Sequence, residues 1–325
     1  MRRRALIAQV AGATVWPLAV HAQSKAMPVI GYLSSKSPAA EAGIVAAARE
    51  SLAQRGFVEG RNLTIEFRWA DGDYTRLPQQ AAELVGRNVS VLMTSGLPAT
   101  LAAKKATSSI PIVFRLAIDP VAFGLTQSLS RPGGNLTGVT MLFDPLTPKK
   151  LQLLHDIIPA AVSIGFLINP NNQNAASHRE YAEKAALSLG LHLAILEASI
   201  PAEIDTEFAA ARQRNIGALL VGDDPFFDVS SKELVDAAAR YGVPTMYYVR
   251  DFTVAGGLIS YGPSFSEMSH QAGEYAGRIL EGAKPADLPV GQPTKIELVI
   301  NMRIVRALGL TIPPSILASA DEVIE

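Results

Sequence analysis

The sequence predicts an α/β protein made of two Rossmann-like lobes, each with a parallel sheet, joined by hinge crossings. Short runs rich in Val, Ile and Leu alternate with alanine-rich amphipathic segments. This alternation is typical of parallel strands that are covered by helices on both faces. The chain has 325 residues, more than one hydrophobic core usually organises, and its two halves repeat the same order of segments.

The first segment of the chain has the pattern of an export signal. Arg2, Arg3 and Arg4 precede an uncharged run over 5–20, and small residues lead up to Ala22. The run has about 16 residues and is broken by a proline, whereas a membrane-spanning helix needs roughly 20 apolar residues. We therefore predict a signal peptide over 1–22, of the Sec or twin-arginine (Tat) type, and a mature chain that begins near Gln23.

The composition narrows the compartment and the partners. The chain has no cysteine, so disulfides, thiol chemistry and a lipid-bearing cysteine are excluded. Without the three arginines of the leader, 26 basic residues stand against 30 acidic ones, a net charge of about −4. This balance does not favour nucleic acid or an anionic membrane as a partner. We expect a periplasmic, unlipidated monomer.

The first half of the mature chain is expected to begin lobe 1. Its apolar runs predict strands over residues 29–33, 63–69, 89–94, 110–114 and 138–141. Amphipathic segments between them predict helices over 39–55 and 76–87. We expect lobe 1 to comprise residues 23–143 and to be completed by 261–292.

The second half repeats this arrangement and is expected to form lobe 2. Its strands are predicted over residues 163–168, 192–196, 218–221, 245–248 and 258–260. Its helices are predicted over 147–157, 175–189, 201–214 and 231–241. Lobe 2 would then comprise residues 144–260 and 293–325.

The two halves also resemble each other in detail. The run IGYL at 30–33 recurs as IGFL at 164–167, and IPIV at 110–113 is echoed by VPTM at 243–246. The strand near residue 91 ends in TSG, and the strand at 218–221 ends in GDD. Two equivalent lobes facing each other across a cleft would produce this repeat. Ligands of such sheets bind beyond the carboxyl ends of the strands.

Polar and conformationally special residues stand at these strand ends. Asx-Pro pairs and glycine are ordinary turn formers, but their occurrence at corresponding strand ends in both halves favours a shared pocket. The candidates of this kind are Ser34, Ser35, Thr94, Ser95, Gly96, Asp119, Asn169, Asp223 and Asp251.

The chemistry of these candidates suits an amino-acid zwitterion. Ser95 and Gly96, at the start of a helix, can bind a carboxylate, although Ser95 can equally be a helix cap. An ammonium group would meet a carboxylate among Asp119, Asp223 and Asp251, for which a solvated surface position is the alternative.

Other side chains complete the candidate pocket. The aromatic residues that could stack on an apolar ligand or simply form core are Tyr32, Phe226, Phe227, Tyr248 and Tyr261. Arg115 directly follows an apolar strand and could neutralise an acidic ligand, form an ion pair between the lobes or lie on the surface. The five histidines lack metal-ligand spacing, so we expect no metal and no cofactor.

Four segments, spread along the mature chain in order, carry a resemblance to a known family. They are residues 52–62 (LAQRGFVEGRN), 131–138 (RPGGNLTG), 255–262 (AGGLISYG) and 318–325 (ASADEVIE). The chain resembles ABC transporter substrate-binding proteins of the family that includes tryptophan- and tyrosine-binding members. The resemblance implies a type I periplasmic-binding-protein fold, a small-molecule ligand, permease partners in the inner membrane, and closure of the lobes around the ligand. It leaves the ligand open.

Other classes of function fit less well. A Rossmann-type enzyme would have G-x-G-x-x-G after its first strand, and here GYLSSK follows. A repressor would begin with a helix-turn-helix, where this chain has its export signal. No catalytic constellation is evident, so we expect a protein that is not an enzyme. A ligand-sensing partner of a membrane receptor stays open as an alternative. Hinges are expected near Phe143-Asp144, near Ser260-Tyr261 and at 289–293.

Overall fold

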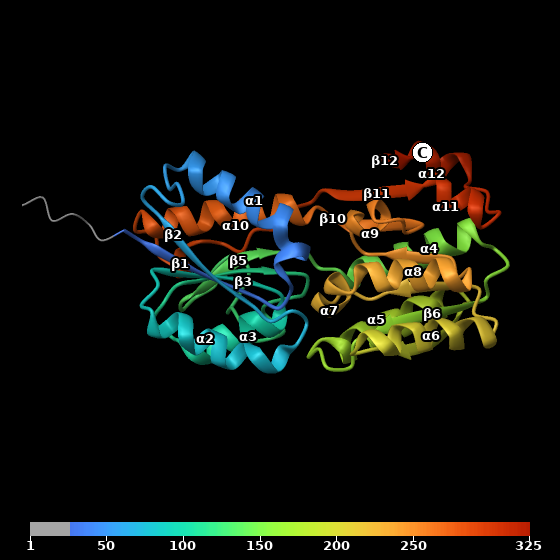
Figure 1. Cartoon of the computed structure of the whole chain (residues 1–325), viewed down its shortest axis with the longest axis horizontal. Coiled ribbons are helices and arrows are strands. Elements are labelled where there is room, and N and C mark those ends of the chain that lie inside the picture. The colour runs from blue at the N-terminus through green and yellow to red at the C-terminus, as the bar shows by residue number, and fades with distance from the viewer. Residues whose placement is uncertain (1–26) are drawn as a thin grey trace, which may run out of the picture.

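The computed structural model describes residues 27–325 as two α/β lobes that lie end to end (Figure 1). The predicted signal peptide at 1–22 and the mature start near Gln23 lie outside the described residues. Within 27–325, no helix is both long enough and apolar enough to cross a membrane.

Lobe 1 is built on a five-stranded sheet in which all neighbouring strands are parallel. In spatial order its strands are β2 (Thr64–Trp69), β1 (Val29–Ser34), β3 (Val91–Ser95), β4 (Ile112–Leu116) and β5 (Leu136–Thr140). One face is covered by α1 (Pro38–Gln54) and α10 (Phe265–Leu280), the other by α2 (Leu77–Gly86) and α3 (Leu97–Ala106). Short 3-10 turns stand at Tyr74–Arg76 and Pro285–Asp287. Each face of the sheet therefore has its own buried core.

Lobe 2 contains a seven-stranded sheet, parallel except for one antiparallel pair, β10 with β11. In spatial order its strands are β12 (Glu322–Ile324), β11 (Ile296–Asn301), β10 (Ile259–Pro263), β9 (Thr245–Tyr247), β8 (Ala218–Val221), β6 (Ser163–Ile168) and β7 (His192–Glu197). Its helices are α4 (Thr147–Ile157), α5 (Ala175–Ser188), α6 (Pro201–Gln213), α7 (Pro225–Val229), α8 (Ser231–Tyr241), α9 (Arg250–Val254), α11 (Met302–Ala307) and α12 (Pro314–Ala318), with a 3-10 turn at Asp144–Leu146. Two buried cores again lie on the two faces of the sheet.

The predicted fold class is confirmed. Each predicted strand corresponds to one of β1 to β10, within two residues at most boundaries. No helix or strand is predicted from the sequence after residue 260. In the structure this part of the chain forms α10 on lobe 1, and β11 and β12 in the sheet of lobe 2. The expected lobe boundary after residue 260 falls inside β10, which continues to Pro263.

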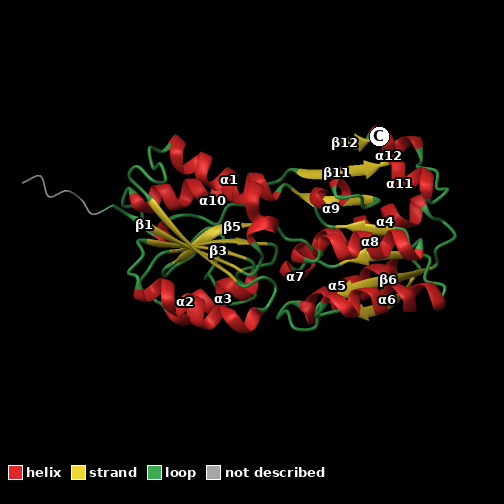
Figure 2. Ribbon diagram, in the orientation of Figure 1, coloured by secondary structure: helices red, strands yellow, loops and turns green. Residues whose placement is uncertain are grey.

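The carboxyl ends of the parallel strands of both sheets point at the space between the lobes (Figure 2). Helices that start there have local capping signals. Ser37 accepts a hydrogen bond from the Ala40 N–H at 3.3 Å and precedes Pro38, so α1 begins at the cleft. In lobe 2, Asp224 caps α7 in the same way, accepting from the Phe226 N–H at 2.8 Å.

Candidate functional site

A cavity of about 40 Å³ lies between the lobes, at the carboxyl ends of their strands. Both lobes contribute polar and charged side chains to it. The lining residues are Lys36, Ser95, Gly96, Leu97, Arg115, Leu116, Ala117, Ile118 and Phe265 from lobe 1, and Asn172, Asn174, Asp223, Asp224, Pro225, Asp228 and Tyr248 from lobe 2.

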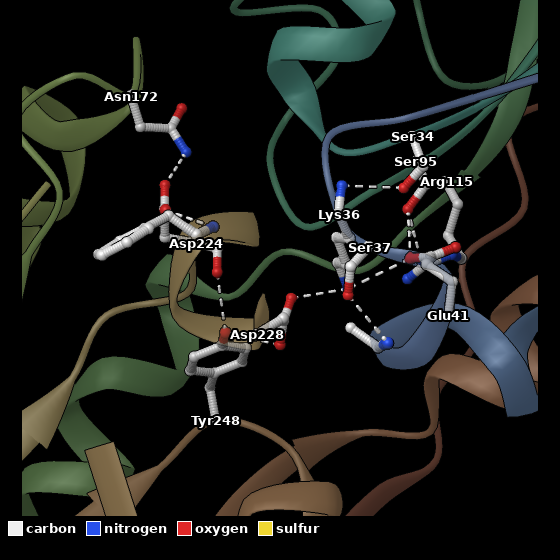
Figure 3. A network of polar contacts seen from close by, with 12 residues as sticks. Ser34, Lys36, Ser37, Glu41, Ser95, Arg115, Asn172, Asp224, Asp228 and Tyr248 are labelled. Atoms are coloured by element: carbon white, nitrogen blue, oxygen red, sulfur yellow. Dashed lines mark hydrogen bonds and ion pairs between the residues drawn. The ribbon is translucent and has the colours of Figure 1, made fainter. Parts of the chain in front are cut away.

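The wall from lobe 1 is organised around Glu41, a fully buried carboxylate on the first turn of α1. Its Oε1 accepts from the Ser95 hydroxyl at 2.7 Å and from Arg115 Nη2 at 2.6 Å (Figure 3). Its Oε2 accepts from the Tyr32 hydroxyl. Burial alone would raise the pKa of Glu41, but Arg115, Lys36 and these hydrogen bonds together lower it. Glu41 is therefore an ionised partner that neutralises Arg115.

Lys36 links this wall to lobe 2. Its Nζ lies 2.7 Å from Asp228 Oδ2 across the cleft and 3.5 Å from Glu41 Oε1. Asp228 also accepts from the Tyr248 hydroxyl at 2.8 Å. The Phe265 ring, at the start of α10, lies 4.4 Å from Lys36 Nζ and 4.7 Å from the centre of the Arg115 guanidinium. The ring therefore stabilises both cations of lobe 1 through their charge.

Asp224 is a second point of contact between the lobes. Its carboxylate accepts from Asn169 Nδ2 at 2.9 Å and from the Asn172 amide, both in lobe 2. It also accepts from the Tyr74 hydroxyl of lobe 1 at 2.7 Å. Burial raises the pKa of Asp224 to about 6, against the lowering effect of these donors. The Tyr74 contact can form only when the lobes are together.

Behind the lobe 2 wall lies a buried cluster that reaches Asp223. His178 Nε2 on α5 is 3.2 Å from Asp223 Oδ1 and 3.5 Å from Asp144 Oδ1. Burial raises the pKa of Asp223 to about 7, although Lys150 opposes the rise. Burial lowers the pKa of Lys150 to about 8, and it also lowers the pKa of His178. Asp223 and Lys150 therefore change protonation near neutral pH.

One backbone position lets the two walls come close together. Gly96 has φ of +90°, in the region that favours glycine, and precedes α3. A Cβ atom at this position would lie 3.0 Å from Pro225 Cγ of lobe 2 and 3.1 Å from Ser35 Oγ. Glycine at this position therefore permits both the turn and the approach of the lobes.

Five of the residues singled out from the sequence line the cavity together: Ser95, Gly96, Arg115, Asp223 and Tyr248. Arg115 pairs with Glu41 of its own lobe at 2.6 Å, rather than with a residue of lobe 2 as the expected ion pair between the lobes would require.

Other predicted residues support the lining from behind. Tyr32 donates to Glu41, and Asn169 donates to Asp224. Ser34 accepts from the Lys36 N–H at 3.0 Å, and Ser35 accepts from the Ala99 N–H at 3.1 Å.

Further predicted residues lie outside the central cavity and its direct support. The Thr94 hydroxyl bonds to Thr100 inside lobe 1 at 2.8 Å. Phe226 lines a separate, outer cavity of about 680 Å³ beside Tyr74. Asp119 is exposed and accepts from the Val121 N–H at 2.8 Å, which is the turn-forming alternative.

Asp251 is also exposed, and it lines a third cavity between the lobes, beside Asp228. Tyr261 is half-buried and packs against the core on one face of the lobe 2 sheet. The central cavity is therefore not lined by Asp119, Asp251 or Tyr261.

Several residues of the site were not among the candidates. Lys36 and Asp228 lie three and seven residues beyond predicted strand ends, while Asp224 belongs to the polar run GDD that follows the strand at 218–221. The asparagine-rich loop with Asn172 and Asn174 directly follows β6 and carried a similar signal. Within 27–325, no group of three His, Cys, Asp or Glu residues is arranged to hold a metal ion.

Comparison with known proteins agrees with the geometry. The sequence pattern of the ABC transporter substrate binding protein family matches residues 33–324. A tyrosine-binding protein of Clostridioides difficile (strain R20291) is 28% identical over 268 residues, which cover 80% of this chain and 75% of that protein.

Solved structures extend the likeness to nearly the whole described chain. A conserved domain protein from Vibrio cholerae O1 biovar El Tor is 28% identical, with a TM-score of 0.85 over 91% of this chain and 99% of the other. An ABC domain from Streptococcus pneumonia in complex with L-Trp is 25% identical, with a TM-score of 0.84 over the same shares. Both the predicted family and the predicted fold are thereby confirmed.

Proposed function

The chain belongs to the ABC transporter substrate-binding protein family, and from this premise we propose that it is the solute-binding component of an importer that captures an amino acid between its lobes. Its partners would be that ligand and the permease subunits of the importer. We further propose export to the periplasm by the N-terminal signal, without a lipid anchor, and a monomeric state without a cofactor.

The observation that carries the proposal is the division of charge across the cavity. Lobe 1 presents Lys36 and Arg115, and lobe 2 presents Asp223 and Asp224. A zwitterion buried between them would meet donors for its carboxylate on one side and acceptors for its ammonium on the other. Two relatives described above, a tyrosine-binding protein and a domain in complex with L-Trp, support an amino acid as the ligand.

The dimensions of the cavity support capture by closure. Sites for small molecules usually measure about 300 Å³ or more, whereas this cavity measures about 40 Å³. We therefore propose that the lobes separate to admit an amino acid and close again around it. We propose that they turn about Phe143-Asp144, Ser260-Tyr261 and 289–293, where the chain passes between the lobes. A ligand that touches both lobes only in the closed form stabilises that form.

Calorimetry on the chain from Gln23 onward, with each of the common amino acids, tests the proposal. A bound ligand at a hundred times its dissociation constant should stabilise the protein by about 2.7 kcal/mol. Small-angle scattering with that ligand should show a more compact particle. Absence of binding by every amino acid would contradict the ligand class, and binding without compaction would contradict closure.

A further inference from the structure

Negative charges outnumber positive ones around the cleft. The cations in the cavity wall and directly behind it are Lys36, Arg115 and Lys150. The carboxylates in the same region are Glu41, Asp144, Asp223, Asp224 and Asp228. With His178 neutral, the fully ionised site has two negative charges in excess. A buried excess of this kind is costly unless a cation or protons balance it.

The pairing of these groups places the excess on lobe 2. Glu41 is matched by Arg115, and Asp228 is matched by Lys36. Asp224 is held by neutral donors, namely two asparagine amides, a tyrosine hydroxyl and a backbone N–H. Asp223 has the neutral His178 beside it. Burial is the main cause of the raised pKa values of Asp144, Asp223, Asp224 and Asp228, so ionising these carboxylates is costly without a compensating cation.

The charged side chains that line the openings of the cleft are also negative. The outer cavity beside Tyr74 is lined by Asp71 and Asp73 and by no lysine or arginine among the described residues, although Arg76, just outside the lining, pairs with Asp71 at 2.7 Å. The third cavity, on the α1 side, is lined by Asp228 and Asp251, again with no basic residue in its described lining. Clefts lined by one sign of charge focus the field and attract ions of the opposite sign.

Two buried polar atoms of the lining are left for a ligand. In the described part of the chain, Asn174 Oδ1 has no hydrogen-bond donor, and Arg115 Nε has no acceptor. Both side chains are more than nine-tenths buried and line the cavity. An acceptor on lobe 2 and a donor on lobe 1 suit a ligand that has an N–H group at one end and a carboxylate at the other.

We propose that the ligand of this cleft is an amino acid with a cationic side chain, so that its positive groups outnumber its carboxylates. This inference rests on the proposed function, amino-acid capture, and specifies the class of amino acid. The carboxylate would face Arg115 and Lys36, while the ammonium and the cationic side chain would face Asp223, Asp224 and Asn174. A neutral zwitterion, including an aromatic one, leaves the excess charge of lobe 2 unbalanced.

Calorimetry with L-arginine, L-lysine, L-tryptophan, L-tyrosine and L-glutamate at pH 7.5 tests the class of ligand. We expect L-arginine or L-lysine to bind at least about tenfold more tightly than either aromatic amino acid, and L-glutamate to bind most weakly. Raising the salt concentration should weaken the cationic ligands more than the aromatic ones, because the openings attract them through charge.

A matched pair of variants tests the residues. Asp223→Asn keeps the shape of the side chain and removes its charge, and it should reduce the preference for a cationic over an aromatic amino acid at least about fivefold. Asp119→Asn makes the same change on the exposed surface of lobe 1 and should leave the preference unaltered. Melting temperatures confirm that both variants fold.

The outcomes separate this inference from the proposed function. Tight binding of L-tryptophan or L-tyrosine with weak binding of L-arginine and L-lysine would overturn the inference and leave amino-acid capture standing. Binding of no amino acid would overturn both. An unchanged preference in the folded Asp223→Asn variant would overturn the assignment of lobe 2 as the cation-binding wall.

Discussion

The wall that lobe 1 contributes to the cleft holds its charges in pairs, whereas the wall of lobe 2 has more carboxylates than cations. Arg115 donates a hydrogen bond to Glu41, and the Ser95 hydroxyl is hydrogen-bonded to both side chains. Asp223 has a neutral histidine and a lysine with a lowered pKa as its neighbours. Two lobes with the same fold thus combine a preorganised surface with one whose charge depends on pH and on the ligand.

The largest expected effect tests whether the pairs of lobe 1 are structural. Glu41→Ala leaves Arg115 buried without its counter-charge, and breaking such a pair from one side costs about 3 to 5 kcal/mol of folding free energy. Urea denaturation measures this loss. Glu83→Ala, which removes the exposed partner of Arg68, should cost far less, because solvent screens that pair. If the two losses are equal, the description of the lobe 1 wall is wrong.

Asp223→Ala should act on binding through lobe 2. Removing one partner of a buried charged contact costs about 2 to 5 kcal/mol, so the affinity for an amino acid should fall at least about thirtyfold. Ser95→Ala removes a neutral hydroxyl from lobe 1 and should cost only about 0.5 to 1.5 kcal/mol. Calorimetry measures both, with melting temperature as the check on folding. An Asp223→Ala variant that binds as the wild type does would disprove the ammonium assignment.

The pH dependence of stability should differ between the wild type and Asp223→Asn. Asp223 has a pKa of about 7 in the folded state, compared with about 3.9 when unfolded. The protonated form therefore stabilises the fold below about pH 4, and this contribution is lost as pH rises through about 7.

The expected loss is about 1 to 3 kcal/mol, less than the full value for a three-unit shift, because solvent reaches part of the side chain. Asparagine does not titrate, so the stability of Asp223→Asn relative to wild type should increase from pH 4 to pH 7.5. Denaturation at a series of pH values checks this. If the stability of the two proteins changes with pH in the same way, the group that titrates is another member of the cluster and not Asp223.

Tyr74→Phe should have the smallest effect, because it removes one contact between the walls. The hydroxyl donates to Asp224 at 2.7 Å and accepts from the Phe226 N–H at 3.2 Å. Loss of this contact should destabilise the closed form by about 0.5 to 1.5 kcal/mol and weaken binding by about threefold to tenfold. Calorimetry gives the affinity, and scattering gives the compaction. An increase in affinity would show that Tyr74 opposes closure.

The sequence by itself determined the strands, the repeated halves and part of the site. Apolar runs of three to seven residues identified β1 to β10 because strand formation follows a local pattern. Residues at or just beyond the carboxyl ends of these strands, including Ser95, Arg115 and Asp223, reach the cavity because the carboxyl ends of parallel strands face one side.

The tertiary structure alone decided which of the candidates meet. Glu41 and Arg115 are 74 residues apart, and their contact depends on the order of the strands and on the face that α1 turns toward the sheet. Asp119 stands three residues beyond β4, yet its loop turns it to the surface. Local patterns record the periodicity of an element but not the direction of a loop or the rotation of a helix, because those are set by packing between distant segments.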